Sequence, residues 1–392
     1  MKQKMMYRMF FPIMVVMGVL IIVTWLLAQT FMADQLRLRS YIVQGNSAAE
    51  ATAVVEAYGG QVTSQLPLID GVAALLPPKT ISRLRDDPAI TGITPNAVVN
   101  VAGARSAGYA PLAQLAQPTA DYPEVIGADV VWDESGNGVT GDGITIAVVD
   151  TGIDSQLPAL SRDALNRSRL NLGMVFLTET ITLTNRIFDQ HGHGTHMAGI
   201  IASSLVGDDG HWNGVAPNVD LISVQVLGTE GWGTYESVIR GIQWVVAHKD
   251  VYNIQVMNLS LVAAPQSPYW ADPLNQAVMR AWAEGIVVVA AAGNGGPLPM
   301  TVGVPGNNPY VITVGAFTDN FTPDDWSDDY ITPFSAAGPT LDAFVKPDVI
   351  APGAHMLSTM KGNTHLAMDH TSYVRDGGTH FQMAGTCLLY TS

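Results

Sequence analysis

Five continuous apolar runs follow residue 125, and they constrain the fold more than any other feature of the sequence. They are Ile144–Val149, Leu221–Val226, Ile254–Leu259, Ile286–Ala291 and Val311–Val314. Segments with helical periodicity separate several of them, at Thr195–Ser204, Thr234–His248 and Pro273–Glu284. Strands that are apolar at successive positions are typical of a parallel sheet that helices cover. The pattern therefore predicts an α/β fold, a parallel sheet with helices on both faces.

A smaller unit is predicted between residues 40 and 101. The residue patterns indicate strands at 40–45, 61–66, 71–76 and 89–101, and helices at 48–58 and 78–85. The resulting order β-α-β-β-α-β is that of a ferredoxin-like α+β unit. Residues 102–122 are rich in Ala, Gly, Pro and Gln and have no clear period, so we predict a linker there.

The first 33 residues have the features of an export segment. Lys2, Lys4 and Arg8 precede the uncharged 19-residue run Phe10–Ala28. A cleaved signal peptide has an apolar core of about 7–15 residues, whereas a membrane-spanning helix needs about 20. We therefore expect residues 1–33 to be a signal peptide or a signal anchor, with membrane contact through residues 10–28 if they are not cleaved. In both cases the bulk of the chain is expected to be extracellular, either secreted or anchored to the membrane.

Charge and cysteine content exclude some partners and some stabilising bonds. The chain has 34 acidic and 19 basic residues, a net charge of −15. Nucleic-acid binding needs a basic surface, so we expect no nucleic-acid partner. Cys387 is the single cysteine, which excludes an intrachain disulfide.

Three polar residues stand where an α/β fold places chemistry. Asp150 and Asn294 each come just after an apolar run, and sites in parallel sheets form beyond the carboxyl ends of the strands. His193 lies between two glycines at the start of a predicted helix. The order aspartate, histidine, late nucleophile is one in which acyl-transfer triads occur. In such a triad the histidine is the base and the aspartate fixes its tautomer.

Two other interpretations remain open from the residues alone. Asp150-Thr-Gly is also typical of an aspartic protease, but that chemistry needs a second such motif, and the chain has none. His191, His193 and His196 could form the metal cluster of a metal-dependent hydrolase, although further ligands have no clear candidate.

Several motifs resemble those of the subtilisin-like serine proteases, the subtilase family. They are Ile146-Ala-Val-Val-Asp150-Thr-Gly-Ile-Asp154, Gly192-His193-Gly-Thr-His-Met-Ala-Gly199, Gly214-Val-Ala-Pro217, Ala292-Gly-Asn294, Val304-Pro-Gly306 and Pro347-Asp-Val-Ile-Ala-Pro-Gly353. The resemblance implies a serine endopeptidase made as a zymogen. Asp150 and His193 would be catalytic, His196 structural, and Asn294 part of the oxyanion hole. Residues 40–101 resemble the inhibitor-type propeptide of the family, and residues 123–386 would form the catalytic domain.

The resemblance also assigns the substrate cleft. It implies that substrate binds along Gly231, Trp232 and Gly233 on one side and Ser260, Leu261 and Val262 on the other. The family often has two glycines lining the specificity pocket where this chain has Val262-Ala263-Ala264. We therefore expect a narrowed pocket.

The chain departs from the family at its last residues. The family continues with Gly-Thr-Ser-Met-Ala-x-Pro, whereas this chain has Cys387 at the nucleophile position and ends at Ser392. We interpret residues 387–392 as a foreign tail on a C-terminally truncated catalytic domain, and expect the chain as written to be inactive. A thiol nucleophile at Cys387 is a second interpretation. A third is a non-catalytic pseudoprotease that holds peptides in its cleft.

The implied partners follow from the family. We expect protein or peptide substrates, and propeptide 40–101 as an intramolecular inhibitor. No cofactor is required, and a structural calcium ion is compatible with the sequence. Asp324, Asp325, Asp328 and Asp329 offer clustered oxygen ligands. A solvated loop is the favoured interpretation of this run because no ligand spacing is apparent, and we assign no metal ligand.

Overall fold

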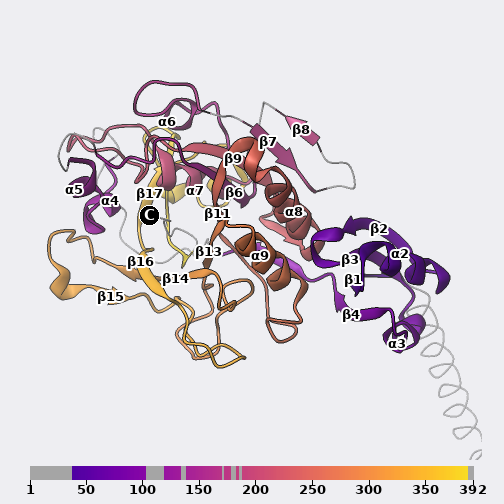
Figure 1. Ribbon diagram of the computed structural model, residues 1–392. Coiled ribbons are helices and arrows are strands. Elements are labelled where there is room, and N and C mark those ends of the chain that lie inside the picture. Colours follow the sequence, from indigo (N-terminus) through magenta and orange to yellow (C-terminus); the bar gives the residue numbers. More distant parts are fainter. Residues whose placement is uncertain are drawn as a thin grey trace, which may run out of the picture. The chain divides into compact units, whose positions relative to one another are not determined.

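The computed structural model describes residues 38–102, 119–133, 138–169, 172–177, 182–184 and 188–386. Within them the chain forms two compact units (Figure 1). The described part of the first unit comprises residues 38–65 and 70–95. The second unit comprises the remaining described residues, including the short segment 66–69.

The first unit has the predicted ferredoxin-like order. Four strands lie side by side in the order β2-β3-β1-β4, and β1 pairs antiparallel with both β3 and β4. Val55 of helix α2 and Leu84 of helix α3 are fully buried against Val43, Val72 and Leu76 of the sheet. The elements are β1 (Arg39–Gly45), α2 (Ala48–Ala57), β2 (Gln61–Leu66), β3 (Gly71–Leu76), α3 (Ile81–Arg85) and β4 (Ile90–Pro95).

The second unit is built on a mostly parallel sheet. Its strands follow the order β15-β14-β13-β11-β6-β9-β7-β8, and β16 pairs with β14. All pairs from β7 to β14 are parallel, while β8 and β15 are antiparallel at the edges. The strands are β6 (Thr145–Asp150), β7 (Leu172–Val175), β8 (Thr182–Thr184), β9 (Asp220–Gln225), β11 (Ile254–Leu259), β13 (Val287–Ala291), β14 (Ile312–Thr318), β15 (Tyr330–Ile331) and β16 (Val349–Pro352).

Two smaller sheets and seven α-helices also belong to the described part of this unit. One small sheet has the order β10-β5-β12 and the other β17-β19-β18. Their strands are β5 (Val98–Val101), β10 (Trp232–Thr234), β12 (Leu261–Val262), β17 (Met356–Thr359), β18 (Val374–Arg375) and β19 (His380–Met383). The helices are α4 (Tyr122–Val125), α5 (Ala128–Asp133), α6 (Pro158–Ser161), α7 (His193–Ala202), α8 (Tyr235–Tyr252), α9 (Pro273–Ala283) and α10 (His365–Asp369).

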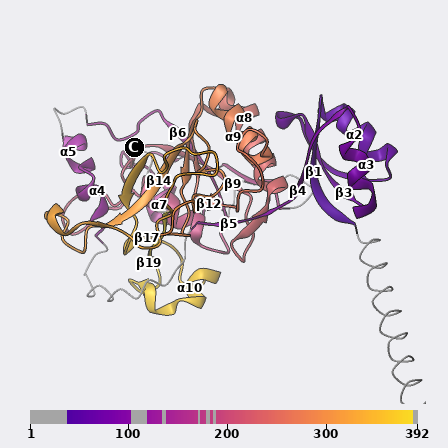
Figure 2. The same cartoon turned by 90° about the horizontal axis from the view of Figure 1, so that it is seen from below.

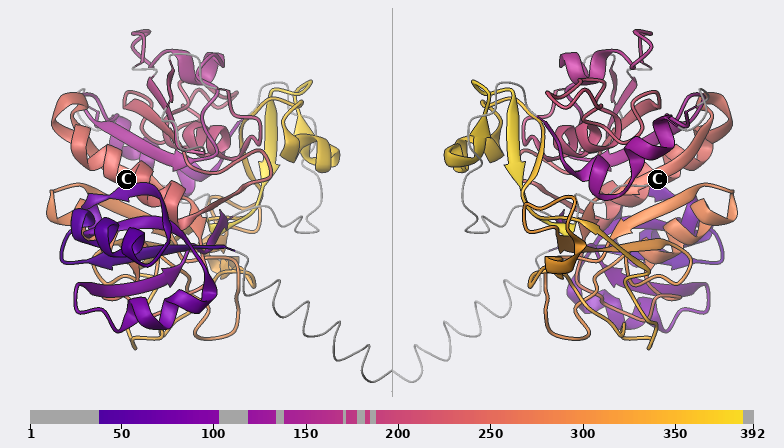
Figure 3. Two further views of the ribbon diagram at one scale, coloured as in Figure 1. Left: turned by 90° about the vertical axis from the view of Figure 1, so that its right-hand side faces the viewer. Right: turned by 90° about the vertical axis from the view of Figure 1, so that its left-hand side faces the viewer.

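Helices cover both faces of the parallel sheet, as predicted. Alternate residues of β6 face opposite ways, because side chains alternate along a strand. Ile146 and Val148 belong to the buried cluster that contains Met197 and Ile200 of α7. On the other face Gly241 lets α8 approach Val224 and Val149 closely. Figures 2 and 3 show α8 and α9 on one side of the unit, with α10 and strands β17 and β19 on the other.

Two predicted boundaries differ from the structure. The strand predicted at 89–101 is two strands, because Pro95 ends β4 and residues 98–101 pair within the second unit. The predicted linker 102–122 also ends differently: Ala120 and Tyr122 are buried and bond to Asn213. Residues 103–118 of that linker lie outside the described residues.

Membrane contact through the apolar run 10–28 is not tested by the structure, because that run lies outside the described residues. No helix within the described ranges is both long enough and apolar enough to span a bilayer.

Candidate active site

Asp150 and His193 form a buried pair at the carboxyl end of the central strand β6. Asp150 is the last residue of β6 and His193 is the first residue of α7, and both are fully buried. His193 Nδ1 lies 2.8 Å from Oδ1 and 3.0 Å from Oδ2 of Asp150. Because the carboxylate accepts the Nδ1 proton, Nε2 is the nitrogen able to exchange a proton with a nucleophile. The structure thus brings together two residues that the sequence placed 43 positions apart.

Asp189 holds the loop before α7 against the end of β6. Its Oδ1 accepts hydrogen bonds from Gly192 N and from the Thr151 hydroxyl, at 2.8 and 2.9 Å. Its Oδ2 accepts from the backbone N–H and the hydroxyl of Thr195, both at 2.8 Å. Burial raises the pKa of this carboxyl, while the bonds from Gly192 and Thr195 lower it. Asp189 therefore caps the start of α7, and it positions His193 indirectly.

Glycine is required at two points around the histidine. Gly192 has φ 103°, a conformation that other residues rarely adopt. Gly194 packs so closely that a Cβ on it would lie 2.2 Å from the carbonyl oxygen of Gly152 and 3.1 Å from the Asp150 side chain. These contacts explain why His193 is flanked by glycines.

The other two histidines of the motif make different contacts. His196 Nε2 donates to the carbonyl of Phe381 at 2.9 Å, and burial lowers its pKa to about 3. His196 is therefore neutral and connects α7 to β19. Burial also lowers the pKa of His191 to about 3. Since the Nδ1 of His193 bonds to Asp150 and the Nε2 of His196 bonds to a carbonyl, the geometry does not favour a metal site shared by the three rings.

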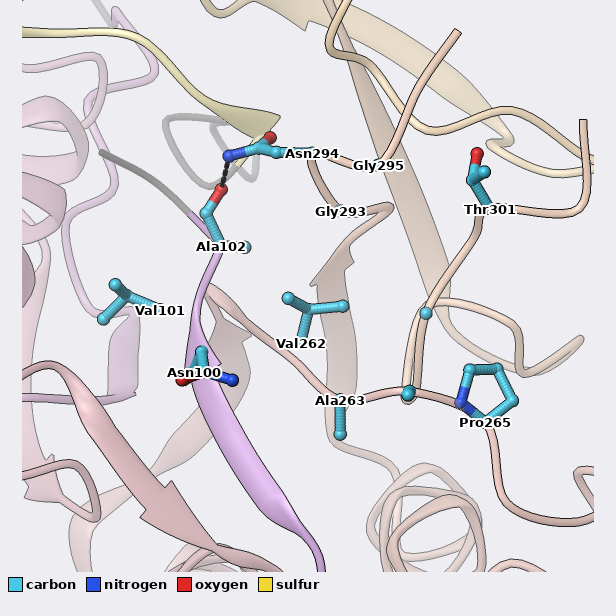
Figure 4. Close-up of a pocket in the computed structure, with 12 residues that line it drawn as sticks. Asn100, Val101, Ala102, Val262, Ala263, Pro265, Gly293, Asn294, Gly295 and Thr301 are labelled. Carbon is cyan, nitrogen blue, oxygen red and sulfur yellow. Dashed lines mark hydrogen bonds between the residues drawn. The ribbon is translucent and has the colours of Figure 1, made fainter. Parts of the chain in front are cut away.

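Asn294 is held by the residue that precedes the nucleophile position. Its Oδ1 accepts hydrogen bonds from the backbone N–H and from the hydroxyl of Thr386, both at 2.9 Å. The Thr386 hydroxyl also accepts a bond from Gly293 N at 3.1 Å. These contacts turn Nδ2 of Asn294 toward the carbonyl oxygen of Ala102, to which it donates (Figure 4). An amide N–H aimed at a peptide carbonyl is the arrangement that an oxyanion hole requires.

Strand β5 occupies the predicted substrate cleft. Residues 98–101 lie between β10 and β12 and pair antiparallel with both. Val101 N donates to Gly231 O at 2.9 Å, and Ala102 N donates to Ser260 O at 3.1 Å. A peptide added as a strand between two edges is a common way of binding extended chains. The chain thus places its own segment 98–102 between the two strands that the sequence predicts to bind substrate.

The residues predicted to bind substrate line this segment. Trp232 is opposite Asn100 and is half exposed, while Gly233 is opposite Val99. Leu261 is opposite Val101, and Val262 is opposite Asn100. The structure therefore brings all six predicted cleft residues beside segment 98–102, although the prediction that they bind substrate is not tested by this contact.

Sequence reasoning missed two parts of the site. It joined residues 98–101 to the strand before them, without assigning them to the cleft, and it gave Thr386 no role. The β-branched residues Val98, Val99 and Val101 are a strand signal, but nothing local identifies the pairing partners of this strand. Cys387, the residue at the nucleophile position, lies outside the described residues.

Among the described residues, one group of side chains could hold a metal ion, and it does not include the three histidines of the His193 motif. Ligand atoms of Asp121, Asp319 and His355 lie within 4.8 Å of one another, and His355 Nε2 is 2.7 Å from Asp319 Oδ1. In the predicted acidic loop, Asp328 accepts hydrogen bonds from Asn320 and Thr322, both at 2.8 Å. The carboxylate of Asp328 is therefore used within the protein.

Comparison with known proteins identifies relatives of this chain. The chain is 36% identical over 259 residues to serine protease AprX of Bacillus subtilis, covering 65% of this chain and 56% of AprX. It is 32% identical over 328 residues to subtilisin E of Bacillus subtilis, covering 83% of this chain and 73% of subtilisin E. It thus spans little more than half the length of AprX.

The fold is also that of a solved structure. Fervidolysin from Fervidobacterium pennivorans, described as a keratinolytic enzyme related to subtilisin, matches with a TM-score of 0.64 at 22% identity, over 90% of this chain and 52% of fervidolysin. A model of the subtilase family matches residues 141–386, which include Asp150, His193 and Asn294. The chain therefore belongs to the subtilase family.

Proposed function

We propose that the protein is a serine endopeptidase made as a zymogen, and that it cleaves its own chain between Ala102 and Gly103. The observation that carries the proposal is the position of segment 98–102. It lies as an extended strand between β10 and β12, with the Ala102 carbonyl accepting a hydrogen bond from Asn294. The buried Asp150–His193 pair belongs to the same unit.

Each residue has a defined part in peptide hydrolysis. His193 Nε2 takes the proton of the nucleophile, and Asp150 stabilises the imidazolium that forms. The nucleophile is the serine that the family carries after Gly-Thr, at the position of Cys387. It attacks the carbonyl carbon of Ala102, and the developing oxyanion accepts a bond from Asn294 Nδ2. His193 then gives its proton to the amide nitrogen of Gly103, which leaves as the new amino terminus. A water molecule that gives a proton to His193 Nε2 next attacks the serine ester of Ala102. The ester bond breaks, the Ala102 carboxylate is released, and His193 returns the proton to the serine oxygen.

Inhibition before and after cleavage follows from the same contacts. Segment 98–102 fills the cleft through backbone bonds to Gly231 and Ser260 and through the buried side chain of Val99. These contacts do not require an intact bond after Ala102. The cleaved propeptide 40–102 therefore remains an inhibitor until it is displaced or digested.

Export of the zymogen is part of the proposal. The basic residues before the apolar run 10–28 direct the bulk of the chain out of the cytoplasm, where protein substrates are accessible. The strongly negative net charge suits a soluble extracellular enzyme.

The test uses a completed chain, in which residues 1–386 are followed by Ser-Met-Ala and the rest of the C-terminal segment of a subtilase relative. We expect it to release its propeptide, to hydrolyse casein, and to be inhibited by phenylmethylsulfonyl fluoride and not by a zinc chelator. His193→Ala should abolish both activities. Its thermal unfolding should remain cooperative, at a lower midpoint than that of the parent because the buried Asp150 carboxylate loses its partner. Peptide binding without turnover in the completed chain would identify a peptide-holding pseudoprotease and overturn the proposal.

A further inference from the structure

We propose that His365, the first residue of α10, positions two loops that border the cleft. One is the histidine loop, residues 190–192, which leads into His193, and the other is the edge loop, residues 228–231, which leads into β10. This inference rests on the proposed function, because it concerns how that peptidase keeps both loops in place. His365 is a positioning residue and takes no part in the making or breaking of bonds.

The backbone of α10 holds the histidine loop. The helix lies in an excursion of the chain between β17 and β19 (Figure 2). The first N–H groups of a helix have no partner within it, and two of them bond to the loop here. His365 N donates to Gln190 O at 2.8 Å, and Leu366 N donates to His191 O at 3.1 Å. The start of α10 therefore fixes the backbone that leads into His193.

The side chain of His365 reaches the edge loop. Its Nε2 lies 3.4 Å from Glu230 Oε2, and its Nδ1 lies 3.6 Å from Asp369 Oδ2. Both carboxylates are acceptors, so a proton on either ring nitrogen has an acceptor beside it. Glu230 directly precedes Gly231, whose carbonyl accepts a hydrogen bond from Val101 N of segment 98–102 at 2.9 Å. The imidazole thus holds the edge loop beside the residue that bonds to the peptide in the cleft.

The two loops also contact each other. The Thr229 hydroxyl donates to Gln190 Oε1 at 2.7 Å. The His191 ring packs so closely on Gly231 that a Cβ there would lie 2.7 Å from its Nε2. The centroids of the His191 and His365 rings are 6.1 Å apart, with the rings nearly perpendicular. A displacement of either loop therefore moves the other, and His365 restrains both.

The two contacts of His365 should affect different kinetic constants. Its N–H fixes the backbone that carries His193, so the loss of that bond should lower kcat. Its imidazole fixes the edge that pairs with the peptide, so the loss of the ring should raise KM and leave kcat nearly unchanged. A residue that served only the overall fold would give no such division.

Three substitutions separate the two contacts. His365→Ala removes the imidazole and keeps the N–H, whereas His365→Gln keeps a side-chain donor for Glu230. His365→Pro removes both the ring and the N–H. The helix should tolerate this proline because position 365 is its first residue, where proline is common. Thr364 has φ −77° and ψ 159°, the extended conformation that a following proline favours.

Amide hydrogen exchange on the full 392-residue chain tests the imidazole without any catalysis. Val101 N bonds to Gly231 on the edge-loop side and Ala102 N bonds to Ser260 on the other, so the two amides report on the two sides separately. His365→Ala should speed exchange of the Val101 amide by about threefold, the effect of one exposed ion pair, and that of Ala102 by less than about twofold. His365→Gln should restore the parent rates. Equal acceleration of both amides, or none, would overturn the role of the imidazole.

The same measurement tests the backbone contact and contains its controls. The amides of His365 and Leu366 should be protected in the parent although they begin a helix, because both are bonded to the histidine loop. Rapid exchange of both would overturn the role of the N–H. Met368→Ala removes a side chain of α10 that is 59% exposed, and should leave all four amides unchanged. Amides of α7, whose residues are all buried, report whether each variant remains folded.

Peptide hydrolysis by the completed chain is the second readout. For a peptide ending in Val-Asn-Val-Ala before a chromogenic amide, His365→Ala should raise KM by about threefold and change kcat by less than about twofold. His365→Pro should in addition lower kcat by about three- to tenfold, the effect of one lost hydrogen bond. A lower kcat in the alanine variant, or an unchanged kcat in a folded proline variant, would overturn the proposal. If the completed chain hydrolyses no peptide, the proposed function fails, and the exchange measurement alone decides the role of His365.

Discussion

The two sides of the cleft are held in place by different kinds of contact. On the side of His193, side chains bind one another and backbone N–H groups inside the protein, and Asp150 and His193 have no exposed surface. On the substrate side, three short strands from distant parts of the chain pair along their backbones. Trp232 at the edge of that sheet is 51% exposed.

This difference indicates which properties can change independently. Buried charged groups tolerate little substitution, because an unpaired partner would be left without solvent. Backbone pairing accepts many side chains, so a single residue of the cleft can alter which peptides fit without disturbing Asp150 or His193. We therefore expect substitutions on the His193 side to change rate and stability, and those on the substrate side to change selectivity.

The largest effect is expected from Asp150→Asn in the completed chain. An asparagine cannot stabilise the imidazolium and favours the wrong tautomer of His193, which in serine proteases costs about 10⁴ in kcat. Steady-state kinetics with a peptide amide as substrate would measure the loss in kcat. We expect KM to change little. A loss of less than tenfold would show that His193 does not depend on this carboxylate.

Asn294→Ala should have the next largest effect. Subtilisin itself loses about 10²–10³ in kcat when its corresponding donor is removed, a known family value that we apply here. Thr386→Val removes the hydroxyl that donates to Asn294 Oδ1 and accepts from Gly293 N, and it leaves the backbone bond from residue 386 to Asn294 in place. We expect it to lower kcat by about tenfold or less, the effect of one weakened hydrogen bond. Equal losses in the two variants would contradict the donor role of Asn294.

Asp189→Asn tests the stability of the His193 side in the 392-residue chain. The substitution removes a charge-assisted acceptor from bonds to Gly192, Thr195 and Thr151, and should cost about 3 kcal/mol in the free energy of unfolding. Urea denaturation would measure it. Asp250→Asn is the matched control, because its side chain is 91% exposed, and it should change stability little. Equal free energies of unfolding for the two variants would show that the hydrogen bonds of Asp189 contribute little to stability.

A smaller effect is expected from the Asp272 carboxyl, which should make the free energy of unfolding depend on pH. Tyr235 follows β10 and donates its hydroxyl to Asp272 at 3.0 Å. Burial raises the pKa of Asp272 from 3.8 to about 6, although bonds from Asn275, Tyr235 and Leu274 oppose it. The stability that this shift contributes is complete below pH 3.8 and is lost as the pH rises through about 6.

The parent should therefore lose stability relative to Asp272→Asn between about pH 4 and pH 7, by roughly 3 kcal/mol at most. Denaturant unfolding of both proteins at several pH values would measure the difference. A difference that is constant, or that grows with pH, would show that the bonds to Asp272 outweigh its burial.

Most strands and helices that depend on a single continuous segment could be predicted from the sequence. The five central strands and the helices between them begin and end within a few residues of the predicted bounds, because each is a continuous apolar or periodic segment. Asp150, His193 and Asn294 were predicted as site residues because each lies at a strand end or helix start, and their catalytic roles stay a prediction. His196 was predicted to be structural, and its ring bonds to the carbonyl of Phe381.

Two features of the site were not predicted, because each depends on contacts between segments that are far apart in the sequence. Val98–Val101 reads as an ordinary strand, and only the edges at β10 and β12 show that it belongs to the cleft. Thr386 holds Asn294 across 92 positions, which no spacing rule indicates.

The most direct test of the account is the position at which the completed chain cleaves itself. Intact-mass measurement and N-terminal sequencing of the mature product would locate it. Because the Ala102 carbonyl accepts a hydrogen bond from Asn294, we predict a mature chain that begins at Gly103. The His193→Ala variant should form no mature chain. A mature chain that begins elsewhere, or cleavage that persists without His193, would contradict the assignment of segment 98–102 as the first substrate.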